Sequence, residues 1–501
     1  MNWKNLTTEQ KLEDFRYLFQ AFKDNHGKLA MIKRMYGYDW VAHEKEFEEE
    51  VRKTKDDREF AYVIDKILDS LNDGHTWLVS PAEWTVYCTN PLFYHLTRKV
   101  PAEAVTYWYE LASGRPRDYR VFPALYFEGE YVVVVDVTLE DCRAKPGWVV
   151  TRVNDIEVDN FVVQQGKHLR YDPVRRKPYS PILGLPISGK VKLTFRNASG
   201  TYVEGEVVSS YETWPARRYR PPYYSNEDGT WIDDSLFLSV IPGVAGYMHF
   251  CRMSSFDEED LTSVKEFLAS VKDLPALIID VRGNPGGYVS AWQKLVMLLA
   301  SEPVRYQCHF APRSGSYVRK LFPRYFEVEK PDFAQEDPEL ARVLPPEVLT
   351  ADFHSPFTES TKLLPDPNSL KYAGKIFVLT DYDTYSAADS LAYFSKQTKW
   401  ATVIGTFTDG GGNGPYATLM PLVLPNSRML VLFPFALALE PDGRSYEESS
   451  RMPDVYVADR ETFVKYVNAL NNGEKLKSLD PEYDAVLREC LKIIKHSTIP
   501  R

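Results

Sequence analysis

The sequence has little cysteine, no metal-binding spacing and no long apolar run, and each absence excludes a class of protein. Its 501 residues include five cysteines that lie far apart, and no Cys-x-x-Cys pair occurs. Neither a disulfide framework nor a zinc site is therefore indicated. The nine histidines show no His-Glu-x-x-His or comparable spacing, so we expect no metal.

Charge and hydropathy narrow the class further. Sixty basic and seventy acidic residues give a net charge of −10, which argues against a nucleic-acid partner. No stretch is long and apolar enough to span a bilayer. The opening "MNWKNLTTEQKLEDF" lacks the apolar core of a signal peptide. We therefore expect a cytoplasmic protein, or an extracytoplasmic one whose leader has been removed.

Three patterns of hydrophobicity follow one another along the chain. Residues 1–118 carry apolar side chains at helical spacing, as in "EDFRYLFQAF". Residues 119–212 contain β-type runs such as "EYVVVVDV", separated by Gly and Asn-Asp turns. Residues 213–501 begin with an Arg- and Pro-rich linker (214–224) and then alternate apolar strands with amphipathic helices, interrupted by an insertion at 302–374. This alternation predicts an α/β layer with mainly parallel strands.

The stretch "TYSAADS" (384–390) allows two interpretations. Ser386 follows the apolar run "IFVLT" and precedes a helical segment beginning at Ala387. A serine there, with Asp389 three residues on, matches an N-cap. The carboxyl ends of parallel strands are also where sites form, and a helix N-terminus favours an oxyanion. Cap and nucleophile are compatible roles for one residue.

A second stretch, "DVRGNPGG" (280–287), also follows a strand and precedes a helix. Gly286 and Gly287 leave backbone N–H groups unshielded, which suits an oxyanion hole. The alternative is a simple strand-to-helix turn. It is not a phosphate-binding loop, because no Gly-Lys-Ser/Thr follows.

A nucleophilic serine needs a base, and none lies near Ser386 in the sequence. His75 is the best candidate because it sits on a Gly-containing turn after a helical segment. A lone histidine is more often structural. A third group must hold the imidazole in the right tautomer, and the loop "YEESS" offers Glu447 and Glu448, which are otherwise read as surface charge.

Six segments, taken together, carry a family resemblance: "LNDGHTWL", "GYMHF", "LIIDVRGNPGG", "VLTDYDTYSAAD", "VIGTFTDGG" and "GRSYEESSRMPDVYV". In this order they resemble the successive motifs of the tricorn and C-terminal-processing (tail-specific) serine peptidases. The resemblance implies a multidomain α/β fold with a helical N-terminal region contributing His75 (1–118), a PDZ-like β module (119–212) and an α/β (crotonase-like, β-α-β) catalytic core (213–501). Within "AKPGWVVTRVNDIEV", Trp148 replaces the usual Asp of the PDZ turn, so we expect a divergent module.

The resemblance also implies which residues act. Ser386 matches the family nucleophile. In the processing branch a lysine follows the serine by twenty-five residues, but this chain has Gly411 there, so no Ser–Lys dyad is available. The tricorn-like branch uses a histidine that matches His75 and a glutamate that matches Glu447. Tricorn has a second serine before the histidine. Gly74 stands there in this chain, which leaves the link from Glu447 to the imidazole open, either direct or through water.

We therefore interpret the chain as a serine-type peptidase that needs no cofactor and acts on a peptide or unfolded polypeptide. Its nucleophile, base, orienting group and oxyanion donors are, respectively, Ser386, His75, Glu447, and the N–H groups of Ala387 and of Gly286 or Gly287. The alternative is a non-catalytic ligand- or peptide-binding protein, because the same core fold occurs in a retinoid-binding protein. Serine, histidine and glutamate at all three matched positions favour the enzyme. An α/β-hydrolase esterase is disfavoured because Ser386 is not in a Gly-x-Ser-x-Gly elbow.

Overall fold

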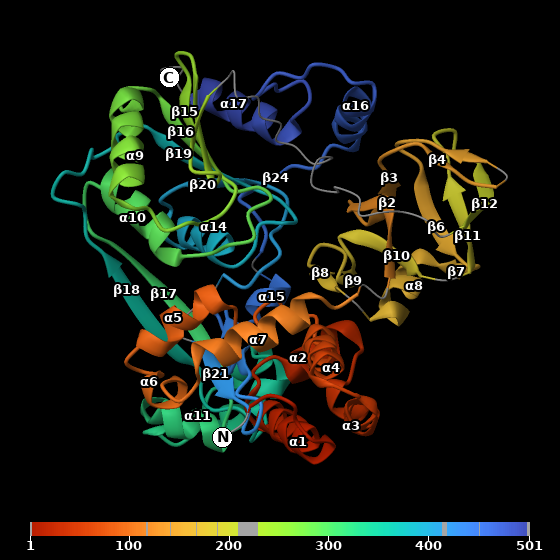
Figure 1. Cartoon of the computed structure of the whole chain (residues 1–501). Coiled ribbons are helices and arrows are strands. Elements are labelled where there is room, and N and C mark those ends of the chain that lie inside the picture. The colour runs from red at the N-terminus through yellow and green to blue at the C-terminus, as the bar shows by residue number, and fades with distance from the viewer. Residues whose placement is uncertain are drawn as a thin grey trace.

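The computed structural model describes residues 3–116, 119–140, 142–166, 168–187, 189–208, 229–412, 418–449 and 451–497. Figure 1 shows a helical N-terminal region, a β module to one side and an α/β layer at the far end of the molecule. No described helix is long and apolar enough to cross a membrane. The linker expected at 214–224 lies outside the described residues.

The N-terminal region is helical, as the apolar spacing predicts. Its helices are α1 (Thr8–Asn25), α2 (Leu29–Tyr36), α3 (Glu44–Lys53), α4 (Asp57–Asp69), α5 (Pro81–Thr89), α6 (Tyr94–Thr97) and α7 (Ala102–Ser113). A capping box at Thr7 begins α1, and the buried Phe15, Phe19 and Phe22 form its inner face.

The insertion at 302–374 shares its hydrophobic core with these helices. It contains β17 (Val304–Pro312), β18 (Phe357–Leu363) and the short helices α11 (Ser316–Leu321), α12 (Phe333–Glu336) and α13 (Pro338–Val343). Strand β17 pairs with β18 and with β23 (Ala436–Leu439). Phe310 and Phe353 of the insertion lie in one apolar cluster with Phe15 and Phe433. The insertion therefore belongs to the body that supports the N-terminal region.

The β module consists of antiparallel strands around a separate core. Its main sheet has the order β10-β2-β3-β6-β11-β12, with β7 pairing β6. These strands are β2 (Tyr119–Phe127), β3 (Glu130–Val133), β6 (Val149–Val153), β7 (Ile156–Glu157), β10 (Ile182–Pro186), β11 (Lys190–Arg196) and β12 (Tyr202–Val208), with helix α8 (Val158–Gln165) and the two small hairpins β4 (Val137–Thr138)–β5 (Arg143–Ala144) and β8 (Arg170–Asp172)–β9 (Lys177–Tyr179). Tyr382 and Phe407 of the α/β layer pack into this core and join the two bodies.

The α/β layer has a seven-stranded sheet in the order β13-β14-β15-β16-β19-β20-β24. Its strands are β13 (Thr230–Ile232), β14 (Leu236–Ile241), β15 (Ala245–Phe250), β16 (Ala276–Asp280), β19 (Lys375–Thr380), β20 (Thr402–Gly405) and β24 (Val455–Tyr456). From β15 to β24 the pairing is parallel, as predicted. Helices α9 (Glu258–Val271), α10 (Val289–Leu299) and α14 (Ala387–Thr398) cover one face, and α17 (Ala485–Ser497) covers the other.

The strand order brings three distant segments to one edge of this sheet. Strands β16 and β19 pair in register, with Asp280 opposite Leu379, so the loops that follow them emerge side by side. The turn before β1 (Trp77–Leu78) approaches from the N-terminal region, because β1 pairs with β22 (Leu430–Pro434), which in turn pairs with β21 (Leu419–Val423). The remaining helices are α15 (Tyr446–Ser449) and α16 (Arg460–Asn471).

Candidate active site

Ser386 lies at the sharp turn between β19 and α14. Its backbone has φ 54° and ψ −119°, a conformation that non-glycine residues rarely adopt and that is often found at functional sites. Its N–H donates to the carbonyl of Gly410 at 2.9 Å. The residue occupies the N-cap position, but its side chain makes no capping hydrogen bond. The predicted cap is therefore wrong in its chemistry, because the strained backbone directs the hydroxyl away from the helix N–H groups.

The Ser386 hydroxyl lies instead against His75. The distance from Ser386 Oγ to His75 Nε2 is 3.0 Å, within hydrogen-bond range, although the residues are 311 positions apart. His75 is largely buried. The backbone N–H of His75 donates to Asp73 Oδ1 at 3.3 Å, and the Thr76 hydroxyl donates to Asp73 Oδ2 at 2.7 Å. The turn that carries the imidazole is thus fixed by local bonds on both sides.

The two loops at the strand ends are tied to each other. The Gly283 N–H donates to Asp381 Oδ1 at 2.8 Å, and the Tyr385 N–H donates to the carbonyl of Asn284 at 2.9 Å. The Thr384 hydroxyl donates to the carbonyl of Val281 at 3.0 Å. The loop "DVRGNPGG" is therefore held in a fixed position beside Ser386.

Of the predicted oxyanion donors, two remain available. The Gly286 N–H donates to Asn284 Oδ1 at 2.8 Å, so it is not free and that option is wrong. Gly286 instead allows close packing, because a Cβ there would lie 2.6 Å from Ser386 Cβ. Gly287 lines the cavity in front of Ser386. Ala387 begins α14, and a first-turn N–H has no partner within its helix.

Glu447 is paired with Lys28. Its Oε1 accepts from Lys28 Nζ at 3.2 Å, and the same ammonium lies 3.1 Å from Asp73 Oδ1. Lys28 is therefore a buried cation between two carboxylates, and sequence reasoning missed it because a lysine beside a helix start is usually a surface residue. Among the described residues, no hydrogen bond joins Glu447 to His75.

Burial and the surrounding charge together set the protonation of His75. Burial, and next the Lys28 ammonium, lower the pKa of His75 from 6.5 to about 4, against the opposing effect of Asp73 and Glu447. The imidazole is therefore neutral at physiological pH and able to accept a proton. Burial would raise the pKa of Asp73, but the Lys28 charge, together with His26, His75 and the Thr76 hydroxyl, holds that pKa well below its usual range.

Tyr385, which sequence reasoning also missed, occupies the other ring nitrogen of the base. Its hydroxyl lies 3.0 Å from His75 Nδ1, and the two rings stack with centroids 4.9 Å apart at 25°. The signal in the sequence was its adjacency to Ser386, which is not enough to identify a contact across 310 positions.

Gly411 makes room for the base. A Cβ at this position would lie 2.5 Å from His75 Cε1 and 3.0 Å from a ring carbon of Tyr385. Any larger side chain there would compete with the imidazole for the same space. Gly411, which stands where the processing branch has its catalytic lysine, thus also leaves the space that the His75 imidazole occupies.

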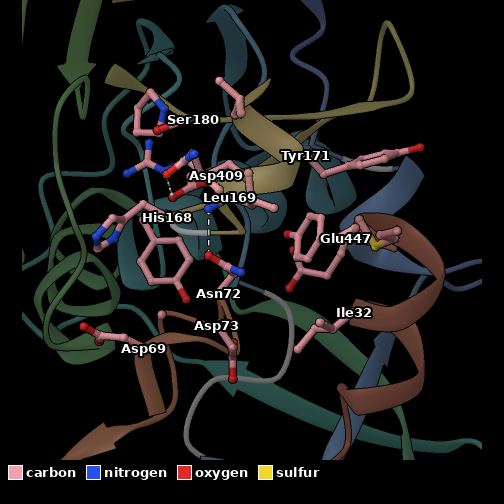
Figure 2. Close-up of a pocket in the computed structure, with 18 of the residues that line it drawn as sticks. Ile32, Asp69, Asn72, Asp73, His168, Leu169, Tyr171, Ser180, Asp409 and Glu447 are labelled. Carbon is pink, nitrogen blue, oxygen red and sulfur yellow. Dashed lines mark hydrogen bonds and ion pairs between the residues drawn. The ribbon is translucent and has the colours of Figure 1, made fainter. Parts of the chain in front are cut away.

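Two cavities adjoin the stacked pair. The front cleft, of about 320 Å³, contains Ser386 and has apolar walls that include Trp77, Val86 and Leu419. The rear chamber, of about 540 Å³, is lined by charged groups that include Glu447, Asp73 and Asp409 (Figure 2). Gly74 and Tyr385 border both spaces, so they form the wall between them. Across the described ranges, no group of three or more His, Cys, Asp or Glu side chains is placed to hold a metal ion.

Comparison with known proteins assigns a class to this arrangement. Residues 245–457, which include both strand-end loops and Ser386, match Peptidase family S41. The chain carries a family S41 peptidase domain. It is accordingly a serine-type peptidase, as the motifs predict.

Solved structures extend the likeness beyond the S41 domain. Mature CPAF complexed with lactacystin is 15% identical with a TM-score of 0.52, and the match covers 98% of each chain. The crystal structure of mature CPAF is 16% identical with the same TM-score of 0.52, covering 98% of this chain and 99% of that one. A putative peptidase from Parabacteroides merdae is 15% identical with a TM-score of 0.44, covering 99% of this chain and 100% of that one. At this identity, the CPAF likeness shows a shared fold.

Proposed function

We propose that this peptidase cleaves peptide bonds through an acyl-enzyme formed on Ser386. The Ser386 oxygen attacks the scissile carbonyl carbon while His75 Nε2 takes the hydroxyl proton. His75 then gives that proton to the leaving amine, and a water activated by the same nitrogen hydrolyses the ester. The 3.0 Å contact between Ser386 Oγ and His75 Nε2 is the observation that carries this proposal.

The N–H groups of Gly287 and Ala387 are the proposed oxyanion donors. Both flank the serine, on the glycine loop and at the helix N-terminus, where the helix dipole adds positive potential. Glu447 acts at longer range in this scheme. Its negative charge stabilises the imidazolium that forms during each proton transfer, while Lys28 holds the carboxylate in place.

The front cleft supports a preference for an apolar side chain beside the scissile bond. Its walls present Trp77, Val86 and Leu419 toward the space next to Ser386. Two finer assignments of the fold belong to the same proposal. The β module is PDZ-like and the core is crotonase-like, which the antiparallel module with its helix α8 and the β-α-β layer support.

A peptide-library digest read by mass spectrometry tests the proposal. The native protein should produce new termini at defined sites, whereas Ser386→Ala should produce none. The melting temperature of Ser386→Ala should match that of the native protein, because the Ser386 hydroxyl caps no helix. Hydrolysis by Ser386→Ala at the native rate would remove this serine from the reaction.

A further inference from the structure

We infer that the hydroxyl of Tyr385 is the group that holds His75 in its working tautomer, so Tyr385 is a positioning residue of this site. The inference rests on the proposed function, because an orienting group matters only if His75 is the base. It goes beyond that function by assigning to a tyrosine the place next to Nδ1 that Glu447, directly or through water, was expected to hold.

The first support is the contact itself. A general base that accepts the serine proton at Nε2 must carry its own proton on Nδ1, and that proton needs an acceptor. Tyr385 is the described residue whose polar atom lies within hydrogen-bond distance of Nδ1, at 3.0 Å. The ring stacking at 4.9 Å restrains rotation of the imidazole. Tyr385 also directly precedes Ser386, so one short segment positions both the nucleophile and its base.

The second support is that two glycines leave the space that the Tyr385 side chain occupies. A Cβ at residue 74 would lie 2.6 Å from the Tyr385 hydroxyl oxygen. A Cβ at residue 411 would lie 3.0 Å from a carbon of its ring. A side chain at position 74 and the Tyr385 hydroxyl therefore cannot occupy this space together. Gly74, which left the link to the imidazole open in the sequence, is explained as the residue that leaves room for the phenol.

The third support is the direction left for the phenol proton. If the Tyr385 oxygen accepts from Nδ1–H, its own O–H must donate elsewhere. Tyr385 borders the rear chamber, which the carboxylates of Asp73 and Glu447 also line (Figure 2). Lys28, Arg170 and Arg451 line the same chamber, so it holds both signs of charge. An O–H that donates to a carboxylate there keeps the oxygen lone pairs toward the histidine, which favours the tautomer that the reaction needs. The charged and titratable groups around this pair are Lys28, Tyr36, Asp73, Asp409 and Glu447.

The test is Tyr385→Phe, which keeps the stacked ring and removes only the hydroxyl. We expect kcat to fall roughly 10²-fold while KM stays within about twofold; the loss is smaller than the roughly 10⁴-fold that a wrong tautomer causes where a carboxylate orients the base, because a phenol is a weaker acceptor. Tyr372→Phe is the matched control, because its hydroxyl also makes a 3.0 Å bond, to the Leu274 carbonyl, outside the site. The control should keep native kcat.

A tautomer measurement separates positioning from a merely structural role. In protein labelled with ¹⁵N-histidine, the His75 signal, identified by its loss in His75→Gln, should report a proton on Nδ1. In Tyr385→Phe the Nε2–H form should gain population. Gly74→Ala, which crowds the hydroxyl from the opposite side, should lower kcat in the same way and serves if Tyr385→Phe does not fold.

The outcomes are distinct. Native kcat and an unchanged tautomer in Tyr385→Phe would overturn this inference and leave the proposed function intact. Full activity in Ser386→Ala would overturn the proposed function itself. A drop in kcat with unchanged KM and a changed tautomer would support the inference.

Discussion

The front cleft and the rear chamber share Gly74 and Tyr385 in their linings and differ in the number of charged side chains around them. The cleft holds the nucleophile among apolar walls, whereas the chamber gathers Lys28, Asp73 and Glu447 behind the base. In the proposed reaction the substrate enters the first space, while Lys28 of the second adds to the effect of burial on the pKa of His75. A buried histidine can therefore be desolvated and still have its pKa adjusted by nearby charges. Those charges lie in a different cavity from the one proposed to hold the substrate.

Replacing the proposed base should have the largest effect. His75→Ala should lower kcat/KM by roughly 10³-fold or more, because no other described base lies within hydrogen-bond distance of the Ser386 hydroxyl. The measurement is kcat/KM on a cleaved library peptide. His43→Ala, at a half-exposed histidine on the N-terminal helices, should keep the native value. Comparable losses in both variants would mean that the effect is not specific to this site.

The next largest effect is expected from a substitution that crowds the stacked His75 and Tyr385 rings. Gly411→Ala places a Cβ 2.5 Å from His75 Cε1, so the imidazole must move and kcat should fall roughly 10²-fold. Gly473→Ala is the control, because both glycines have positive φ, at 75° and 70°, but nothing lies within 4 Å of a Cβ at 473. Both variants carry a similar backbone cost, so their difference in kcat isolates the contact with the base. Equal activities would contradict the packing described here.

Removing the cation of the chamber should move the pH profile. In Lys28→Met the carboxylates of Asp73 and Glu447 lose their neutralising partner and favour the imidazolium, so the pKa of His75 should rise above about 4. The acid limb of kcat/KM then moves to higher pH. Activity at pH 5 should fall roughly tenfold if the limb reaches about pH 6, and it should recover by about pH 8.

The same change should cost stability, about 3–5 kcal/mol, because it leaves two buried carboxylates without their cation. Denaturant unfolding measures this cost. Lys33→Met, on the helix that Lys28 precedes and with an exposed pair to Asp39, should alter neither quantity appreciably. An unshifted acid limb in Lys28→Met would mean that the charge of Lys28 does not influence the pKa of His75.

A change in the cleft should alter preference more than rate. Val86→Lys places a cation on the wall beside Ser386, and should lower kcat/KM for peptides with an apolar side chain at the scissile bond by roughly tenfold. Peptides with an acidic side chain there should gain. Val174→Lys, at an exposed valine of the β module, should leave the preference unchanged. The ratio of kcat/KM for the two peptide classes is the quantity to compare.

The sequence predicted the front of the site better than the back. Strand-end loops have a local signature, so Ser386 and the glycine loop could be found from hydrophobic pattern and motif alone. His75 could be proposed from its turn and its family match. Lys28 and Tyr385 could not, because their roles depend on tertiary contacts across hundreds of residues that no local pattern records.

Two further differences have the same origin. The cap predicted for Ser386 failed because propensity describes an ordinary helix start, whereas this backbone has φ 54°. The prediction of Gly286 as an oxyanion donor was wrong because its N–H donates to Asn284 Oδ1, a contact that depends on the fold of the loop. The alternation of strands and helices, by contrast, is a property of pattern, and the parallel sheet was predicted from it.

Labelling with a fluorophosphonate tests the central claim most directly, because the reagent requires an activated serine. Mass spectrometry should find the adduct on Ser386, with a labelling rate that rises through an acid limb near pH 4, where His75 loses its proton, and stays flat to neutral pH. Labelling should be abolished in His75→Ala. Folded protein that takes no label, or carries it on another serine, would contradict the account.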